Sequence, residues 1–448
     1  MVERDARFYP DNSGTAGDRS PAARDRDRLI HTSAFRRLAG VTQVAAAAEG
    51  EGFHNRLTHT LEVAQLARRV AERLVKQHGQ ANLSALGGLD PEVAEAAAIA
   101  HDLGHPPFGH VGESELNQCM KRHGNEGFEG NAQSFRIVCS LALRSVSHTG
   151  LNLTRATLNA ILKYPWPEGT SGKPAQKWGF YGGERAHFDF ARAAEGANSP
   201  LKSLEAEIMD WADDVAYAVH DVYDFYRAGL IPLHVLVHNP PEWDRLVDDV
   251  LARTEDELAR GVRNEALDRG VVTRLRLILE SLLPTDAFAG TIEHRGQLRS
   301  WSSAMITRFV GKEAFDVNSE FDGVASRVWH DADRRQEVTF LQEITRQYVI
   351  RNPATQSVQF GQRRIIRDLF DLFMADKSLL EDHATATSPY PAALREALRQ
   401  IPEGPTSAAL KARAVSDSIS AMTEDQVIGL HRRLTGAALG SMFDPIVR

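Results

Sequence analysis

The chain has 448 residues, a formal net charge of −8 and a hydrophobic fraction of 42%. That apolar content is enough for a large buried core, and the length suggests two or three domains. The mildly acidic balance argues against a dedicated nucleic-acid coat protein, whose domain would usually be basic. It does not exclude a polyanionic substrate, because a local cluster of a metal ion, lysine and arginine can hold phosphates inside an acidic protein.

The sequence contains few signals for targeting or for redox chemistry. The first 28 residues are polar and charged, and no stretch approaches the roughly 18 consecutive apolar residues that a membrane span needs. We therefore expect no signal peptide, no membrane partner and a cytoplasmic location. The two cysteines, Cys119 and Cys139, cannot supply a thiolate zinc site and do not suggest a disulfide scaffold, and we expect both to be buried.

Helical periodicity recurs along most of the chain, between recognisable start and stop signals. Residues 1–23, rich in Pro, Gly, Asp and Ser, are expected to form a flexible arm. Gly40 and Gly79 end two predicted helices, and Asp90 with Pro91 begins another. Helices are predicted over residues 24–40, 57–77, 91–104, 111–123, 131–145 and 201–228.

The segments between these helices carry turn and loop signals. Residues 41–52 are expected to form a short extended turn, 104–110 a turn rich in Pro and Gly, and 165–184 a loop. Residues 231–345 have a helical pattern without a usable motif, and 383–407 resemble a linker around a short helix. Because alternating strand patterns are nearly absent, the predicted fold class is all-α.

Histidines concentrate in one part of the chain, where seven of the 17 fall within 70 residues. The pair His101-Asp102 stands at the end of an apolar helix. An imidazole beside a carboxylate suits Mn, Fe, Co, Ni, Zn or Mg. Most such pairs are solvated helix-end residues, but the small side chains of 96–100 predict a well-packed helix that presents these ligands rigidly.

Further ligands are needed to complete a metal site. His59 begins the upstream helix and is the first candidate, although it also fits an ordinary surface or core histidine. Asp213 lies on a helix that is apolar on one side, where a buried carboxylate is costly unless paired or metal-bound. Asp213, Tyr217 and Asp221 share one helical stripe, and Asp214, about 100° away, is the rival ligand. Considered without the two aspartates, Tyr217 would be interpreted as an aromatic residue of the core.

Six blocks of sequence carry a resemblance to a known family. They are RDRDRLIHTSAFRRLAGVTQV, HNRLTHTLEVAQLAR, AHDLGHPPFGHVGE, GFEGNAQSFR, GLNLTRATLNAILKYPW and MDWADDVAYAVHDVYD. In this order they resemble the deoxyguanosine triphosphate triphosphohydrolase family of the HD superfamily. The resemblance is dense over residues 24–228, and a weaker echo runs from RQYVIRNP to AVSDSISAMTEDQ. Val41 replaces a lysine expected before Thr42-Gln43, which bears on base or allosteric selectivity rather than on catalysis.

The resemblance implies a role for each matching site residue. The implied ligands of a divalent metal ion (Mn, Mg, Co, Ni, Fe or Zn) are His59, His101, Asp102 and Asp213. The implied acid–base pair near the α-phosphate is His110 with Glu113, and His105 would lie beside them. Gln43 and Asp221 would recognise the sugar, and Tyr217 would pack against it. The triphosphate would be held by Arg56, Asn131, Lys163, Tyr164 and Lys177, the last of which follows a loop of variable length.

Three of these features have simpler interpretations. Asn131 also fits a helix N-cap, a role compatible with substrate contact. Lys163-Tyr164 also fits a helix end, where the helix dipole favours lysine. In GQRRIIRDLF, the arginines 363, 364 and 367 fit a solvated basic helix face, or a site for single-stranded DNA or an effector nucleotide.

The resemblance predicts metal-dependent hydrolysis of deoxynucleoside triphosphates (dNTPs) at the α-phosphorus, giving deoxynucleoside and inorganic triphosphate. The alternatives are another HD-domain nucleotide phosphohydrolase, which has no evident use for Gln43 or the His110–Glu113 pair, and a catalytically silent nucleotide- or nucleic-acid-responsive regulator. The resemblance also implies a homo-oligomer, often a hexamer. The predicted regions are the arm (1–23), an HD phosphohydrolase core (24–230), a helical extension (231–345) and a C-terminal helical region (346–448).

Overall fold

The computed structural model describes most of the chain. The described residues are 3–11, 18–43, 53–196, 198–263, 265–321, 326–375, 392–402, 404 and 406–438. Most of the turn predicted at 41–52 and the first part of the linker predicted at 383–407 lie outside these ranges.

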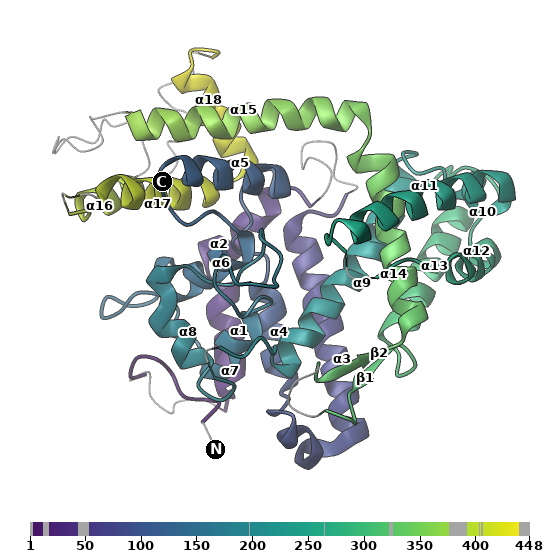
Figure 1. Ribbon diagram of the computed structural model, residues 1–448, viewed down its shortest axis with the longest axis horizontal. Helices are drawn as coiled ribbons and strands as arrows, with labels where there is room; N and C mark the ends of the chain where they lie inside the picture. The colour runs from purple at the N-terminus through teal and green to yellow at the C-terminus, as the bar shows by residue number, and fades with distance from the viewer. Residues whose placement is uncertain are drawn as a thin grey trace. The chain divides into compact units, whose positions relative to one another are not determined.

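The chain divides into two units, each assembled from separate stretches of sequence (Figure 1). The first unit comprises residues 1–61, 96–200 and 357–448, and the second comprises 62–95 and 201–356. Three helices, α3 (Arg56–Ala85), α4 (Pro91–Ala100) and α15 (Pro353–Ala375), contribute residues to both.

The first unit contains the N-terminal helices, the histidine-rich segment and the C-terminal helices. Its elements, besides the first turn of α3 and the last turn of α4, are α1 (Pro21–Ile30), α2 (Ser33–Arg37), η1 (Leu38–Gly40), α5 (Gly109–Arg122), α6 (Gly130–Arg136), η3 (Ile137–Leu141), α7 (Arg155–Ile161), η4 (Gly182–Glu184), α8 (Arg185–Ala191), most of α15 (Pro353–Ala375), α16 (Ala392–Arg399), α17 (Ser407–Ser420) and α18 (Glu424–Leu434).

The second unit is organised around one long helix, α9 (Leu204–Arg227), which packs against α13 (Ile292–Val310) and α14 (Ala332–Thr345). Its other elements are α10 (Leu233–His238), α11 (Pro240–Ala259), α12 (Arg269–Leu282), β1 (Phe315–Val317), β2 (Val328–His330) and η5 (Arg346–Ile350). The two strands pair antiparallel, with Asp316 opposite Trp329.

The all-α prediction is confirmed. Within the described ranges, β1 and β2 are the only strands, and both fall in the stretch 231–345 that was expected to be helical throughout. Each strand has three residues, which is too short for an alternating pattern to stand out from the sequence. Over the same described ranges, no helix combines the length and apolarity that crossing a membrane requires.

Several predicted helix boundaries were wrong for local reasons. The helix expected over 24–40 is broken, because Thr32 leaves the helical conformation and its hydroxyl accepts a hydrogen bond from the Phe35 N–H, which starts α2. The helix expected to continue to Gly104 ends at Ala100. The stop expected at Gly79 is a kink, with φ of +75°, between two helical stretches.

The described part of the predicted flexible arm is tied to the rest of the first unit. The Arg7 guanidinium donates to Asp25 at 2.6 Å, and Arg7 forms a β-bridge with Thr154. The Asn152 side chain accepts from the Tyr9 N–H and donates to the Tyr9 carbonyl. Residues 3–11 are therefore held by defined contacts, although their composition is typical of a free arm.

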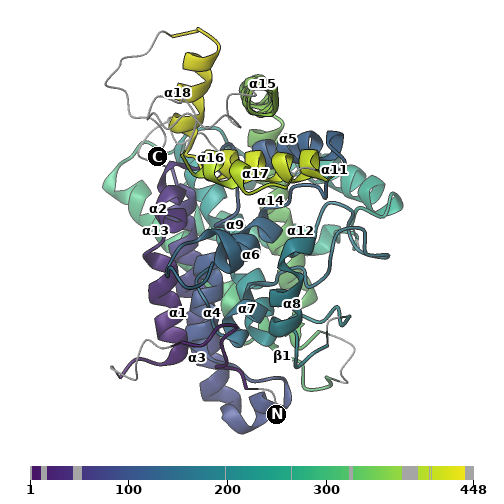
Figure 2. The same ribbon diagram turned by 90° about the vertical axis from the view of Figure 1, so that its left-hand side faces the viewer.

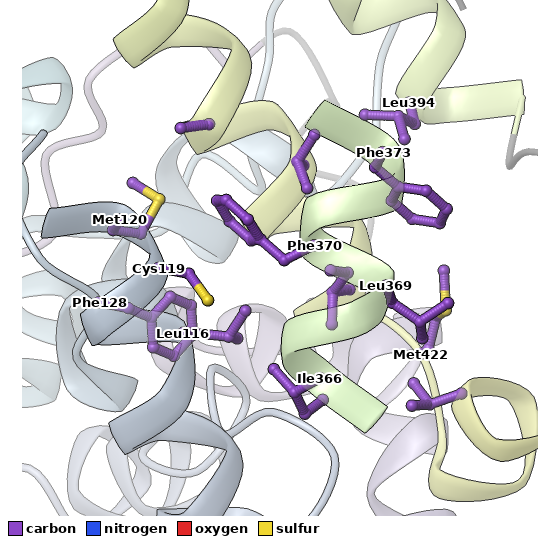
Figure 3. Close-up of a cluster of buried hydrophobic side chains, with 14 of the residues drawn as sticks. Leu116, Cys119, Met120, Phe128, Ile366, Leu369, Phe370, Phe373, Leu394 and Met422 are labelled. Carbon is purple, nitrogen blue, oxygen red and sulfur yellow. The ribbon is translucent and has the colours of Figure 1, made fainter. Parts of the chain in front are cut away.

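An apolar cluster in the first unit packs against α5 (Figure 3). This helix begins just after residues 101–108, which we call the histidine-rich turn because they include His101 and His105. Side chains of α15, including Ile366 and Phe370, point toward Leu116 and Cys119 of α5. Figure 2 shows α17 running beside α5, which it contacts directly. The cluster also includes Phe108, so the C-terminal helices help to fix the residue from which α5 starts.

Candidate active site

The end of α4 presents His101 and Asp102 from a tightly packed turn. Residues 96–100 are all buried, as their small side chains predicted. A Cβ on Gly104 would lie 2.2 Å from the Gly130 carbonyl oxygen and from the Ser134 nitrogen. The Ser134 hydroxyl accepts from the Gly104 N–H and donates to the His101 carbonyl, each at 2.8 Å. The turn is therefore pressed against α6, and only glycine fits at 104.

His59, His101 and Asp102 form a buried group whose candidate ligand atoms lie within 4.8 Å of one another. The His59 and His101 rings have centroids 5.7 Å apart. His101 Nδ1 lies 2.6 Å from the Ala98 carbonyl oxygen, so Nδ1 carries the proton. That tautomer leaves the Nε2 lone pair as the ligand atom, which is how metal-binding histidines are usually oriented.

Asp102 lies between Arg56 and His105. Its Oδ2 accepts from the Arg56 guanidinium at 2.6 Å, and its Oδ1 lies 2.9 Å from His105 Nδ1. Burial raises the pKa of Asp102, but Arg56, His101 and His105 outweigh burial and hold it well below the usual range. Burial, followed by Arg56, lowers the pKa of His105 to about 4, so this imidazole is neutral at neutral pH.

The donor set of this group fits a divalent metal ion. Two imidazoles and one ionised carboxylate are the mixed nitrogen and oxygen ligands that such ions accept, and all three side chains are buried. The positive charge of the Arg56 guanidinium balances the negative charge of the ionised Asp102 carboxylate. The residues His59, His101 and Asp102 could thus hold a metal ion, whose identity this donor set does not select.

His110 and Glu113 lie together in the first turn of α5. His110 Nδ1 is 2.7 Å from Glu113 Oε2, and the His110 side chain is 67% exposed whereas that of Glu113 is 11% exposed. Burial raises the pKa of Glu113, but the hydrogen bond from His110 and the charge of Lys177 outweigh it and lower the pKa well below its usual value. An exposed imidazole therefore rests on a buried, ionised carboxylate. The His105 ring lies 5.4 Å from that of His110.

Lys177, from the predicted loop 165–184, reaches the same carboxylate. Its Nζ lies 3.1 Å from Glu129 Oε1 and 3.4 Å from Glu113 Oε1. Burial lowers the pKa of Lys177, but Glu113 and Glu129 outweigh burial and raise it, so the amine is charged. Burial raises the pKa of Glu129. The lysine thus sits between two carboxylates beside the His110–Glu113 pair.

The interpretation of Asn131 as a helix N-cap was wrong. Glu129 caps α6, because its side chain accepts from the Asn131 and Ala132 N–H groups at 2.6 and 2.9 Å. The Asn131 amide donates to the same carboxylate at 2.8 Å. Lys163 and Tyr164 follow the C-terminal end of α7 and are half-buried, and Gln43 is half-buried at the end of its described segment.

The remaining candidate residues belong to the second unit. Asp213 and Tyr217 are half-buried on α9, and Asp221 is buried. The backbone carbonyl of Asp214, the rival ligand, accepts from the Gln342 side chain at 3.3 Å. A role for Asp213, Tyr217 and Asp221 beside the buried group of the first unit stays a prediction.

Sequence reasoning missed two charged residues that hold the histidine-rich turn. Buried Arg37 donates to the carbonyl oxygens of Leu103 and His105, each at 2.8 Å. Buried Glu424 accepts from the Phe108 N–H at 3.0 Å. Arg37 lies in the block FRRL, where its charge alone did not separate it from its neighbours. Glu424 lies in the weak C-terminal match, where the pattern Thr-x-x-Gln is typical of a helix start and does not reveal a long-range contact.

The basic stretch of α15 and the two cysteines have ordinary structural surroundings. Arg367 pairs with Glu115 at 2.7 Å, and Arg364 pairs with Asp368 at 2.7 Å. Two of the three arginines therefore already have carboxylate partners, which favours a solvated helix face. Cys119 and Cys139 are buried free thiols, as expected.

Comparison with known proteins places the chain in a class and then in a family. An HD-domain family model matches residues 56–218, and a model described as a phosphohydrolase-associated domain matches 329–433. The fold and these matches define an HD-domain phosphohydrolase.

Curated relatives extend the match to nearly the whole chain. A deoxyguanosinetriphosphate triphosphohydrolase-like protein of Streptomyces coelicolor is 34% identical over 96% of each chain. Proteins with the same description from Caulobacter sp. strain K31 and Corynebacterium efficiens are 35% and 34% identical, over 96% and 93% of this chain and 93% and 92% of theirs. The chain belongs to the deoxyguanosinetriphosphate triphosphohydrolase-like family, which confirms the resemblance carried by its sequence blocks.

Proposed function

We propose that this protein hydrolyses dNTPs at the α-phosphorus, releasing the deoxynucleoside and inorganic triphosphate, with a divalent metal ion bound at the HD residues. The observation that carries the proposal is the arrangement of the turn after α4. The span 101–113 contains two members of the buried group of metal-type ligands, His101 and Asp102, and an exposed imidazole resting on a buried carboxylate. Hydrolysis of a phosphate ester is favoured by a metal ion that polarises the phosphoryl group and by a proton donor for the leaving oxygen.

The metal ion would be held by His59, His101 and Asp102, with Asp213 as the proposed fourth ligand. When bound, it would polarise the α-phosphate and make water a better nucleophile. Arg56 keeps the Asp102 carboxylate ionised and oriented. His105 Nδ1 lies 2.9 Å from the other oxygen of the same carboxylate, so a neutral imidazole packs directly against Asp102.

His110 would deliver a proton to the leaving 5′-oxygen of the deoxynucleoside. Its Nδ1–H donates to Glu113, so Nε2 is the atom that meets substrate, and its exposure leaves that side accessible. Glu113 is held in place by the Gly130 N–H at 3.1 Å and by Lys177. The carboxylate would therefore orient His110.

The proposed substrate contacts extend from this pair. Lys177, Arg56, Asn131, Lys163 and Tyr164 would neutralise and bind the triphosphate, whose charge requires several donors. Gln43 and Asp221 would hydrogen-bond the sugar, and Tyr217 would pack against it and exclude a 2′-hydroxyl by shape. Residues 24–230 would supply the catalytic core, followed along the chain by the helical extension 231–345 and the C-terminal region 346–448.

Product analysis tests the proposal. The purified protein is incubated with each of the four dNTPs and Mn²⁺, beside the variants Asp102→Asn and Asp371→Asn. Asp371 forms a surface pair with Arg122 and is the matched control. Inorganic triphosphate with deoxynucleoside, lost only in Asp102→Asn, is the expected result.

Other products would identify a different reaction. Pyrophosphate with a monophosphate, or orthophosphate alone, would indicate another HD-domain phosphohydrolase. No product from any dNTP, from dNTP mixtures or in the presence of single-stranded DNA would favour a catalytically silent regulator.

A further inference from the structure

The first residue of α18 bridges two segments that carry candidate site residues. Glu424 Oε1 accepts from the Thr42 N–H at 2.8 Å and from the Phe108 N–H at 3.0 Å, and Oε2 accepts from the Thr42 hydroxyl at 2.8 Å. The carboxylate is buried. All three donors are neutral groups, so this is a hydrogen-bonded bridge rather than an ion pair. We call this arrangement the Glu424 bridge.

The Phe108 end of the bridge lies where the backbone is strained. Phe108 has φ +66° and ψ +17°, the left-handed conformation that residues other than glycine rarely adopt. This conformation turns the chain into α5, and His110 follows two residues later. A strained residue persists only when its surroundings hold it. Here Glu424 holds the N–H, while the apolar cluster holds the ring.

The Thr42 end of the bridge is connected to the HD residues. Thr42 forms a β-bridge with Asn55, and the Arg56 N–H donates to the Val41 carbonyl at 3.2 Å. Arg56 in turn binds Asp102. One carboxylate therefore ties the segment that leads into His110 to the segment that fixes Arg56 and precedes Gln43.

The start of α18 is itself fixed against the same segments. A Cβ on Gly40 would lie 2.9 Å from the Thr423 side chain, so that side chain packs directly against the Gly40 backbone. Arg37 donates to the Met422 carbonyl at 3.2 Å, and its other contacts are the carbonyl oxygens of the histidine-rich turn. The position of Glu424 is thus determined from both sides.

We infer that Glu424 is a positioning residue, through which the C-terminal region sets the distance between the His110–Glu113 pair and the HD ligands. The inference rests on the proposed function for its catalytic consequence. It gives the phosphohydrolase-associated region, which matches residues 329–433, a direct task at the candidate site. Glu424 acts through the backbone of Phe108 and Thr42 and not on the substrate.

The bridge makes a specific prediction for the amide isostere. In Glu424→Gln, the amide oxygen can accept from both backbone N–H groups, and the amide nitrogen can donate to the Thr42 hydroxyl oxygen, which both donates and accepts. Glutamine should therefore preserve the bridge without its charge. Alanine removes it, and aspartate is too short to span both segments while keeping the charge at the start of α18.

The test compares Glu424→Ala, Glu424→Gln and Glu424→Asp with Asp425→Ala, the matched control at the next, exposed position of α18. We expect kcat to fall on the order of 10²-fold in the alanine variant, because misplacement of a reacting group has that effect. The aspartate variant should also have a lower kcat, and in both variants KM should change much less than kcat. The glutamine variant and the control should resemble wild type. Equal loss in Gln and Ala would overturn positioning in favour of a role for the charge.

A second measurement does not depend on substrate or on the alanine variant folding. Amide hydrogen exchange of peptides covering residues 103–110 should be faster in Glu424→Asp than in wild type or Asp425→Ala, because the Phe108 amide loses its acceptor. Unchanged exchange together with unchanged kcat would overturn the inference. If wild type hydrolyses no nucleotide, the proposed function fails, and the exchange experiment still decides whether Glu424 positions the turn.

Discussion

His110 Nδ1 lies 2.7 Å from Glu113 Oε2, one turn further along α5, with the imidazole exposed and the carboxylate buried. The carboxylate is also bound by the Gly130 N–H and by Lys177. Of the two partners, Glu113 is the fixed one and His110 is the one that can reach a ligand. This asymmetry suits the proposed proton donor, which needs a fixed carboxylate to orient it.

Replacing Glu113 with glutamine should leave the shape of the pair and remove its charge. We expect kcat to fall on the order of 10²-fold or more, because general acid catalysis contributes about that much, while KM changes little. Steady-state kinetics measures both. Glu115→Gln is the control on the same helix, since Glu115 pairs with Arg367. A kcat for Glu113→Gln equal to that of the control would remove Glu113 from the mechanism.

Lys177→Met should weaken substrate binding and disturb Glu113 together, because the ammonium contacts Glu113 and Glu129. The expected loss in kcat/KM is about 10- to 10³-fold, the usual cost of removing a charge that stabilises phosphate. Lys173→Met is the matched control, because Lys173 lies in the same loop but over the Trp166 ring. Similar kcat/KM values for the two variants would show that Lys177 binds no substrate phosphate.

Tyr217→Ala should reduce the preference for deoxyribonucleotides over ribonucleotides, if the ring packs against the sugar as proposed. Tyr223→Ala, on the same helix with Arg227 over its ring, is the control. The ratio of kcat/KM for each dNTP to that of its ribonucleotide measures the preference. Retention of the wild-type ratio in Tyr217→Ala would contradict the proposed role.

Two glycines should respond oppositely to alanine. Gly104→Ala places a Cβ 2.2 Å from backbone atoms of α6 and should destabilise the fold by about 1–3 kcal/mol or more, the usual range for overpacking. Gly296, in α13, has nothing within 4 Å of an added Cβ, and Gly296→Ala should stabilise by about 0.5–1 kcal/mol through helix propensity. Thermal unfolding measures both. Equal melting temperatures would contradict the packing described for the turn after α4.

The pH dependence of stability should include a contribution from His330 in β2. Burial, then the charge of Arg335, lowers its pKa to about 4. A folded-state pKa below the unfolded value means that the unfolded chain binds the proton more tightly. The contribution of His330 to the free energy of unfolding is therefore fully present above about pH 6.5 and is lost as the pH falls toward 4. The full loss should be on the order of 3 kcal/mol. His330→Phe, which suits neighbours Trp211 and Phe315, should reduce the drop in melting temperature between pH 7 and 5. An undiminished drop would assign the titration elsewhere.

Local pattern was enough to predict the parts of the site that depend on one helix. The small residues before His101 predicted a packed helix end, and a spacing of three residues puts His110 and Glu113 on one face of α5. The contacts of Arg37 and Glu424 could not be predicted in this way, since Glu424 reaches Thr42 across 382 positions of sequence. Thr32 interrupts an otherwise continuous helical pattern because its side chain competes for a backbone N–H. Long-range hydrogen bonds and local capping, rather than hydrophobic periodicity, account for these differences.

The most direct test of the proposed reaction is hydrolysis of a dNTP in water enriched in ¹⁸O, followed by mass spectrometry of both products. Attack at the α-phosphorus forms the new bond to that phosphorus and breaks its bond to the 5′-oxygen, so we expect one ¹⁸O in the inorganic triphosphate and none in the deoxynucleoside. Label in orthophosphate released with a deoxynucleoside diphosphate, or label in the products of pyrophosphate release, would contradict the proposal.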